Sequence, residues 1–434
     1  MSVLPIALEV IPHPVNGAVA VPSSKSYTNR ALLLASLAEG DSVIRHPLQS
    51  DDAEAMTEAL RALGVDIEQR GEDVVVHGRG RFLPPAGPID CRDSGTTIRF
   101  LTAACALFDF PVTLTGSIQL QRRPLGPLLD ALRALGVEVS ADRIDGCPPV
   151  TVRGPIQPAA VSVDASKSSQ YASALLMALG AAGAEGSSVR VDNLVSRPYV
   201  EMTLDSMAAF GVRCALAKGV DTRFRLVHDA PYGATDYAVE FDASAAGHIL
   251  AAAALAGGEV TIAPAAGDTR QPDFRLVKVL AHMGCTVRVR GDSVSLSRRG
   301  PLQGAGTVDM RDWPDMLSTV AVVAAFAHGA TAITGVAHAR LHETDRIAAT
   351  ATELRKMGVT VVERPDGLSI FGGHPHGARI QSYGDHRMAM SFAAAGAAIH
   401  GMIISDPGCV RKTYPHFWDD LRAIGIESRE PSAS

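Results

Sequence analysis

Apolar positions along the chain follow a pattern that repeats six times. In each copy an apolar helical stretch ends in a glycine, and the stretches read ALRALGV (twice), SMAAFGV, VLAHMGC, ELRKMGV and DLRAIGI. These glycines are spaced by 72, 75, 73, 74 and 67 residues, and they are Gly64, Gly136, Gly211, Gly284, Gly358 and Gly425. Such regular spacing predicts an array of six copies of one α/β unit.

A small polar or acidic residue lies about forty residues before each glycine and opens a nearly uncharged run. The six residues are Ser26, Ser94, Ser168, Ser244, Asp315 and Asp385. Serine and aspartate cap helix N-termini because their oxygens accept from free backbone N–H groups. The runs that follow have no polar face, which predicts buried first helices around 31–38, 100–107, 172–182, 249–256, 319–327 and 388–399. The stretch before each glycine, such as 52–63, is two-faced and predicts a second, surface-covering helix.

Short alternating runs between the helices predict strands. They lie at 74–78, 112–116, 188–193, 259–263 and 330–335. Each repeat is therefore expected to follow the order β-α-β-α-β-β, with core helices wrapped by sheets. Six such repeats in 434 residues divide naturally into two domains of three.

The composition is that of a globular chain, with 47% hydrophobic and 20% charged residues. A net charge of −6 argues against nucleic acid as the main partner. The apolar run 388–404 is too short for a membrane span and contains His400, and the N-terminus has no signal-peptide pattern. The six cysteines lack C-x-x-C spacing and are expected to be reduced core thiols. A cytoplasmic enzyme is the expectation.

Lysine is rare here: six lysines stand against 34 arginines. A lysine beside a helix start in such a chain suggests a need for a compact or titratable charge, and Lys25 and Lys412 occupy such places. In VPSSKSYTNR, Lys25, Ser26 and Arg30 surround a predicted helix start. Free N–H groups, the helix dipole and two cations together favour an anion site, although the P-loop pattern is absent.

Similar polar motifs stand at other repeat junctions. Each motif alone is equally compatible with a helix cap or a solvated charge run, but their common position at repeat edges favours function. They are DSGTTIR with Gly95, QRRP with Arg123, SKSSQ with Ser168, Ser169 and Gln170, SRPY with Ser196 and Tyr199, WPDM with Asp315, RLHETDR with Glu343 and Arg346, GDHRMAM with Arg387, and RKTYP with Lys412.

Taken in this order, over residues 12–425, the motifs resemble the 5-enolpyruvylshikimate-3-phosphate synthase family. The resemblance implies the enolpyruvyl transferase fold, a two-domain inside-out α/β barrel. Three repeats would form a first domain over 22–239, on the shikimate 3-phosphate side. The other three would form a second domain from 1–21 and 240–434, with the active site in the cleft between them and a hinge that closes on binding.

The resemblance also implies a reaction. The enolpyruvyl group of phosphoenolpyruvate would be transferred to the 5-hydroxyl of shikimate 3-phosphate by addition and elimination, with release of phosphate. No metal or organic cofactor is expected, the two substrates are the only expected partners, and the protein would be a monomer. Addition and elimination need a base, an acid and cations that hold the leaving phosphate.

Site roles follow from the same resemblance, position by position. Asp315 would accept the proton of the substrate hydroxyl, Glu343 would donate a proton to the phosphoenolpyruvate methylene, and Lys25 would bridge both substrates. Shikimate 3-phosphate would be bound by Lys25, Ser26, Arg30, Ser168, Ser169, Gln170, Ser196, Tyr199, Asp315, His338 and His342. Phosphoenolpyruvate would be bound by Lys25, Gly95, Arg123, Gln170, Arg346, Arg387 and Lys412.

Four positions depart from the family pattern. His342 and His338 stand where many members have lysine and asparagine, so shikimate 3-phosphate binding is expected to weaken as pH rises above the imidazole pKa. Asp93 replaces a common asparagine, and Lys167 is a candidate partner for its charge.

Two other readings remain open from the residues. A related enolpyruvyl transferase that acts on a UDP-sugar shares the repeats, but its family uses a mobile loop with a cysteine, and residues 111–125 contain none. A noncatalytic six-repeat scaffold would need neither Asp315 nor Glu343.

Overall fold

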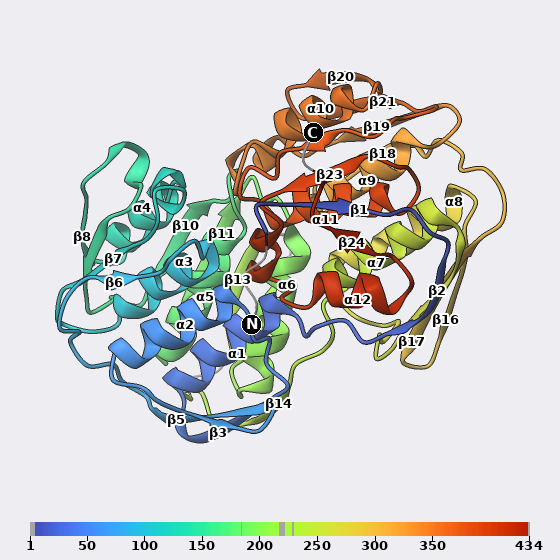
Figure 1. The fold of residues 1–434 in the computed structure, drawn as a ribbon. Coiled ribbons are helices and arrows are strands. Elements are labelled where there is room, and N and C mark those ends of the chain that lie inside the picture. Colours follow the sequence, from blue (N-terminus) through green and yellow to red (C-terminus); the bar gives the residue numbers. More distant parts are fainter. Residues whose placement is uncertain (1–4, 184, 217–221, 228–229, 433–434) are drawn as a thin grey trace. The chain divides into compact units, whose positions relative to one another are not determined.

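The computed structural model describes residues 5–183, 185–216, 222–227 and 230–432 (Figure 1). The chain packs as two compact units. Unit 1 comprises Met1–Pro22 and Glu240–Ser434, and unit 2 comprises Ser23–Val239. Each unit has its own apolar core, so each is described by itself.

The strands of the described residues form six four-stranded sheets, three in each unit. In unit 2 the sheet orders are β14-β3-β5-β4, β6-β7-β9-β8 and β10-β11-β13-β12. In unit 1 they are β16-β17-β15-β2, β18-β19-β21-β20 and β22-β23-β1-β24. Each sheet has one parallel edge pair, such as β6 with β7 in the register Ile89↔Leu114, and its remaining pairs are antiparallel.

The strands of unit 2 are β3 (Glu39–Arg45), β4 (Asp66–Arg70), β5 (Asp73–Arg79), β6 (Ile89–Asp90), β7 (Val112–Thr115), β8 (Glu138–Ala141), β9 (Val150–Arg153), β10 (Ala160–Asp164), β11 (Ser188–Asp192), β12 (Cys214–Leu216), β13 (Arg223–Leu226) and β14 (Asp236–Ala238). Those of unit 1 are β1 (Ala7–Val10), β2 (Val15–Val19), β15 (Gly258–Ile262), β16 (Thr286–Arg290), β17 (Ser293–Arg298), β18 (Gly306–Asp309), β19 (Ala330–Thr334), β20 (Thr360–Arg364), β21 (Gly367–Phe371), β22 (Arg379–Ile380), β23 (Met402–Ser405) and β24 (Ser428–Arg429).

The helices alternate along the chain between buried helices and helices with one exposed face. The buried first helices are α1 (Lys25–Leu37), α3 (Gly95–Cys105), α5 (Gln170–Ala181), α7 (Ala243–Ala256), α9 (Leu317–Ala325) and α11 (His386–Gly396). The second helices are α2 (Asp51–Ala62), α4 (Gly126–Ala134), α6 (Arg197–Ala209), α8 (Leu276–His282), α10 (Arg346–Lys356) and α12 (Phe417–Ala423). All nine residues of α9 are buried, as the absence of a polar face predicts. The 3₁₀ turns are η1 (Leu120–Arg122), η2 (Ile144–Gly146), η3 (Pro272–Arg275), η4 (Pro314–Met316), η5 (Ala337–Leu341) and η6 (Pro407–Lys412).

The predicted repeat order β-α-β-α-β-β is confirmed, for example by β6, α3, β7, α4, β8 and β9. In three places, however, a strand comes from outside its repeat. β14 pairs in parallel with β3, β2 pairs in parallel with β15, and β1 lies between β23 and β24. Segments distant in sequence therefore complete the first, fourth and sixth sheets.

The six repeat glycines all have a left-handed backbone after the second helix. Their φ angles are 84°, 81°, 93°, 105°, 78° and 97° in chain order. A residue without Cβ adopts this conformation at low cost, which is why glycine ends helices so often.

The predicted N-caps are correct at two of the six positions. Ser94 accepts from the N–H of Thr97, and Asp385 accepts from the N–H of Arg387. The predictions for Ser26, Ser168 and Ser244 are wrong by one or two residues, because Ser24, Ser169 and Asp242 precede α1, α5 and α7. Asp315 lies inside turn η4 rather than at a cap. Several small polar residues stand side by side in these segments, and the point where the backbone enters the helix selects among them.

No helix of the described residues is both long enough and apolar enough to span a membrane. The six cysteines are all free thiols. Cys91, Cys105 and Cys285 are buried as predicted, whereas Cys147, Cys214 and Cys409 are only partly buried.

Candidate functional site

Unit 1 contains a charged cluster centred on Arg346, the first residue of α10. This side chain is 1% exposed and binds three carboxylates. Its Nε donates to Asp385 Oδ2 at 2.7 Å, its Nη1 to Asp315 Oδ1 at 2.8 Å and its Nη2 to Glu343 Oε2 at 2.7 Å. Burial opposes the charge, but Asp385, Glu343 and Asp315 outweigh it and raise the pKa of Arg346 above its ordinary value.

Asp315 is shared between two guanidinium groups. Besides Arg346, Arg387 donates from Nη2 to Asp315 Oδ2 at 2.8 Å. Asp315 lies in η4 immediately before α9, and Arg387 is the second residue of α11, which packs against α9. The adjacent starts of two buried helices therefore bring these residues together.

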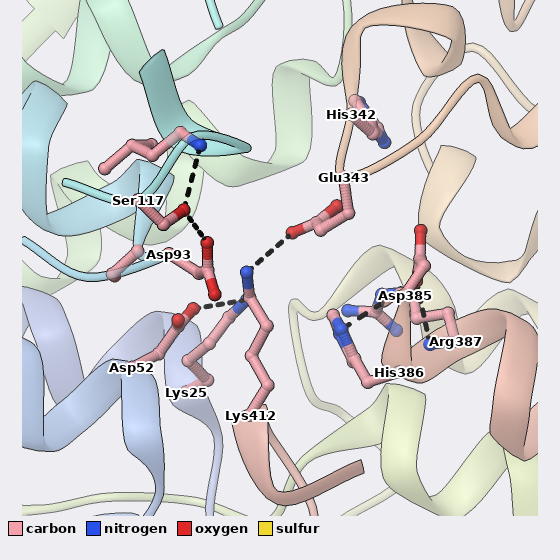
Figure 2. Close-up of polar contacts among 12 residues, drawn as sticks. Lys25, Asp52, Asp93, Ser117, His342, Glu343, Asp385, His386, Arg387 and Lys412 are labelled. Atoms are coloured by element: carbon pink, nitrogen blue, oxygen red, sulfur yellow. Dashed lines mark hydrogen bonds and ion pairs between the residues drawn. The ribbon is translucent and has the colours of Figure 1, made fainter. Parts of the chain in front are cut away.

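Glu343 also lies between two cations. Arg346 binds its Oε2, and Lys412 Nζ lies 3.5 Å from its Oε1, as Figure 2 shows. Lys412 ends η6, and the side chains of Lys412 and Glu343 are only 7% and 8% exposed. A carboxyl group held in this way can exchange a proton beside groups that bind anions.

Asp385 has a role that the sequence analysis missed. It was predicted only as a helix cap, yet it also accepts from Arg346 through both carboxylate oxygens, at 2.7 and 3.3 Å. The same carboxylate accepts from the N–H of Arg387 at 2.9 Å. One buried group thus fixes two candidate binding residues. The only sequence signal was an acidic residue two positions before an arginine at a helix start.

The structure contradicts the predicted imidazole titration. Burial lowers the pKa of His338 to about 4. Burial, and then Arg346, whose Nη1 lies 3.1 Å from His342 Nδ1, lower the pKa of His342 well below its ordinary value. Both shifts favour neutral rings near neutral pH and argue against the predicted weakening of shikimate 3-phosphate binding above the imidazole pKa. A sequence motif could not reveal this burial.

Unit 2 contains a second cluster, built around Arg30 of α1. Its Nε donates to Thr203 Oγ1 at 2.8 Å, its Nη1 to the carbonyl of Ser26 at 2.8 Å and its Nη2 to the carbonyl of Tyr199 at 2.9 Å. The guanidinium also lies 5.2 Å from the ring centroid of Phe100. Burial lowers the pKa of Arg30 to about 10, so it stays charged at neutral pH.

Lys25 is the first residue of α1, and its Nζ lies 3.2 Å from Asp52 Oδ2 on α2 (Figure 2). Asp52 is 2% exposed, so this lysine is held at the helix start by a buried carboxylate. No motif in the sequence predicted this partner. An acidic residue in the first turn of the next helix was the only available signal.

Gly95 and Arg123 lie in direct contact. A Cβ added to Gly95 would meet Arg123 Nη1 at 2.6 Å, so only glycine leaves the guanidinium where it is. Nearby in the fold, Arg99 Nη1 donates to Gln170 Oε1 at 2.7 Å. The starts of α3 and α5 thus place Gly95 and Gln170, two of the predicted residues, beside arginines.

The remaining predicted residues of unit 2 lie at helix starts. Ser168 accepts from the N–H of Gln170 at 3.2 Å, and Ser169 is buried at the cap of α5. Ser196, buried and with a φ of 52°, precedes α6, whose third residue is Tyr199. These side chains surround the beginnings of two helices that pack together, where anions are favoured.

Asp93 accepts a short hydrogen bond from the hydroxyl of Ser117, which Figure 2 shows. Lys167, the predicted partner of Asp93, lines a pocket of about 400 Å³ together with Asp130 and Asp145. Its effect on Asp93 stays a prediction. No cluster of histidine, cysteine and carboxylate side chains suited to a metal ion occurs among the described residues.

Six α/β repeats in two units, with buried arginines and carboxylates at helix starts, define a class of α/β enzymes that handle anionic substrates. The family model of EPSP synthase (3-phosphoshikimate 1-carboxyvinyltransferase) matches residues 10–421. The chain belongs to the EPSP synthase family, and the predictions of fold, family and enzyme class are confirmed.

Two relatives and one solved structure illustrate the match. A 3-phosphoshikimate 1-carboxyvinyltransferase of Methanoculleus marisnigri is 41% identical over 415 residues, which cover 95% of this chain and 98% of the relative. One from Methanothermobacter thermautotrophicus is 43% identical, covering 94% and 96%. The structure of EPSP synthase from Acinetobacter baumannii superposes with a TM-score of 0.78 at 27% identity, covering 98% of this chain and all of that one.

Proposed function

We propose that this protein transfers the enolpyruvyl group of phosphoenolpyruvate to the 5-hydroxyl of shikimate 3-phosphate and releases phosphate, as a step of the shikimate pathway toward aromatic amino acids. The observation that carries the proposal is the pairing of Asp315 and Glu343 with Arg346. This arrangement supplies an acid, a base and a fixed cation at one place. It argues against the noncatalytic scaffold, and the lack of a cysteine in residues 111–125 argues against the UDP-sugar transferase.

The cations of the site can compensate the negative charge of phosphoenolpyruvate. Arg346, Arg387 and Lys412 of unit 1 lie against carboxylates that a substrate carboxylate or phosphate can replace, since guanidinium and ammonium groups bind both. We assign phosphoenolpyruvate binding to these three residues and to Lys25, Gly95, Arg123 and Gln170 of unit 2.

Arg30 is the strongest support for shikimate 3-phosphate on unit 2. Its buried charge is held by hydroxyl and carbonyl oxygens rather than by a carboxylate in the described contacts, and such a charge favours an anionic ligand. We assign shikimate 3-phosphate binding to Lys25, Ser26, Arg30, Ser168, Ser169, Gln170, Ser196, Tyr199, Asp315, His338 and His342. The two histidines would act as neutral hydrogen-bonding groups.

In the proposed addition step, Asp315 accepts the proton of the 5-hydroxyl of shikimate 3-phosphate. The oxygen of that hydroxyl forms a bond to C2 of phosphoenolpyruvate. Glu343 donates a proton to C3, which becomes a methyl group. In the elimination step, C3 loses a proton to the Glu343 carboxylate, the bond from C2 to the phosphate oxygen breaks, and phosphate leaves with the proton that Asp315 had accepted. The cations stabilise the charge on that phosphate.

The two units carry complementary parts of this constellation. We therefore propose that the domains 22–239 and 1–21 with 240–434 enclose the active site between them and close when both ligands bind. Small-angle scattering tests this: the radius of gyration should fall when both ligands are added, and equal radii contradict closure. We further propose a cytoplasmic monomer that needs no metal or organic cofactor.

Phosphate release on mixing the protein with both substrates tests the function. Replacing shikimate 3-phosphate with a UDP-sugar should abolish release, and Asp315→Asn should lower kcat by about 10²–10⁴-fold because the base is lost. Asp312→Asn is the matched control, since Asp312 is partly exposed and pairs with Arg275. The proposal is overturned if the intact protein releases no phosphate from its two substrates. It is also overturned if phosphate is released only when a UDP-sugar replaces shikimate 3-phosphate.

A further inference from the structure

A strained turn precedes α11 in unit 1. The N–H of Asp385 donates to the carbonyl of Ser382 at 2.9 Å, and the two residues between them, Tyr383 and Gly384, have φ angles of 58° and 66°. Two consecutive left-handed residues define a tight turn that favours glycine and asparagine. A tyrosine is uncommon in this conformation, so other contacts have to hold it there.

Glu353 of α10 supplies those contacts. Although it is 0% exposed, its Oε1 accepts from the hydroxyl of Tyr383 at 2.6 Å and its Oε2 accepts from the N–H of Gln381 at 3.1 Å. Lys356 donates to both oxygens, at 2.8 and 2.7 Å, and compensates the buried charge. Burial, followed by this hydrogen bond, raises the pKa of Tyr383 above its ordinary value, so its hydroxyl remains a donor.

One helix therefore holds the segment 381–385 at two points. Arg346 at the start of α10 binds Asp385, and Glu353, seven residues later and on the same side of the helix, binds Gln381 and Tyr383. Asp385 in turn accepts from the N–H of Arg387. The conformation of the turn thus determines where Asp385, Arg346 and Arg387 lie.

We propose that Glu353 is a positioning residue for phosphoenolpyruvate binding. It acts through Gln381 and Tyr383, fixes the turn Ser382–Asp385, and so places the guanidinium groups of Arg346 and Arg387. The inference rests on the proposed function, in which these two arginines bind phosphoenolpyruvate.

Steady-state kinetics of Glu353→Gln and Tyr383→Phe test the proposal. Both variants should raise KM for phosphoenolpyruvate about tenfold, the scale of one lost hydrogen bond to a charged group. KM for shikimate 3-phosphate should stay close to that of the intact protein. Glu259→Gln, an exposed residue of β15, is the matched control and should change neither constant. Tyr383→Phe keeps the test valid if Glu353→Gln does not fold, because Tyr383 is 41% exposed.

A double-mutant cycle separates positioning from stability. In a Tyr383→Gly background the turn no longer carries the strain of a left-handed tyrosine. Adding Glu353→Gln to this background should therefore raise KM for phosphoenolpyruvate by a smaller factor than Glu353→Gln does in the unaltered protein. Unchanged KM for phosphoenolpyruvate in both single variants overturns the proposal, and so does an equal rise of both KM values together with a lower Tm. In either case an active intact protein leaves the proposed function standing, whereas an inactive one refutes that function instead.

Discussion

The pKa of each buried arginine in this protein depends on the groups that surround that particular side chain. Three carboxylates outweigh burial and raise the pKa of Arg346, whereas burial lowers the pKa of Arg30 to about 10. The first arginine is the centre of a charged network, whereas the hydrogen bonds of the second, among the described residues, go to hydroxyl and carbonyl oxygens. Such differences depend on which side chains lie within about 3 Å of each other, as the hydrogen-bond distances require.

Gly95→Ala should weaken phosphoenolpyruvate binding. The new Cβ would lie 2.6 Å from Arg123 Nη1, so the guanidinium must move away from the start of α3. We expect KM for phosphoenolpyruvate to rise about tenfold or more, which corresponds to the loss of a charge-assisted hydrogen bond. Gly87→Ala is the control, because nothing lies within 4 Å of its added Cβ. Equal KM values in the two variants would contradict this steric account.

Asp273→Asn should change how stability depends on pH. Asp273 is 3% exposed and accepts from the Ser244 hydroxyl, and burial raises its pKa to about 6. Because the folded pKa is the higher one, protonation favours the folded state. The stabilisation is complete below the unfolded pKa and is lost as pH rises through about 6.

Between pH 5 and 7.5 the free energy of unfolding of the unaltered protein should therefore fall by about 1 kcal/mol relative to Asp273→Asn. Urea unfolding at several pH values measures this difference. Asp268→Asn, at an exposed position, should show the same pH dependence of the free energy of unfolding as the unaltered protein. Parallel curves for Asp273→Asn as well would show that Asp273 is ionised throughout.

At the scale of the elements, helix ends determine where the functional groups lie. Glycines with positive φ end the second helices, and the starts of the buried first helices carry the candidate site residues. One helix can have both features: α10 begins with the candidate site residue Arg346 and ends shortly before Gly358. Packing of these helices in each core is therefore what brings their starts together.

Gly211→Ala isolates the contribution of one helix end. Gly211 has a φ of 93°, and nothing lies within 4 Å of an added Cβ, so only backbone strain opposes the change. We expect unit 2 to lose about 1 kcal/mol of stability, measured by urea unfolding. Gly233→Ala, also unobstructed but without a positive φ, should cost less. Equal losses at the two sites would argue against strain at the helix end.

At the scale of the whole molecule, segments distant in sequence complete the sheets. β1 and β2 join sheets of unit 1 whose other strands follow residue 257, and β14 joins the first sheet of unit 2. Folding of unit 1 therefore requires the beginning of the chain. Such non-local pairing carries a cost in loop entropy that the completed cores must offset.

Val10→Asp should destabilise unit 1 selectively. Val10 is fully buried in β1, between β23 and β24, and an unpaired carboxylate there is strongly unfavourable. Hydrogen exchange should quicken in β23 and β24 while β3 and β5 of unit 2 stay protected. Ile6→Asp, one residue before β1 and 91% exposed, should leave both units unchanged. Equal loss of protection in both units would contradict independent cores.

The sequence predicted much of the fold because local patterns encode it. The six glycines, the apolar first helices and the alternating strands follow from burial and backbone preference within a few residues. The caps at Ser26, Ser168 and Ser244 were misplaced because neighbouring residues have nearly the same capping ability. Motifs named Arg346, Asp315 and Glu343 individually, but no spacing in the sequence indicated that one arginine binds both carboxylates.

By itself, the sequence determined the repeat, the kind of helix in each half of a repeat, and the polar residues at the repeat edges, because each depends on short-range periodicity. Tertiary structure alone decided that Asp385 holds Arg346, that Asp52 pairs with Lys25, that β1 lies between β23 and β24, and that His338 and His342 are neutral. These features depend on which residues meet after tens or hundreds of intervening positions, and on how much water the packing excludes around them.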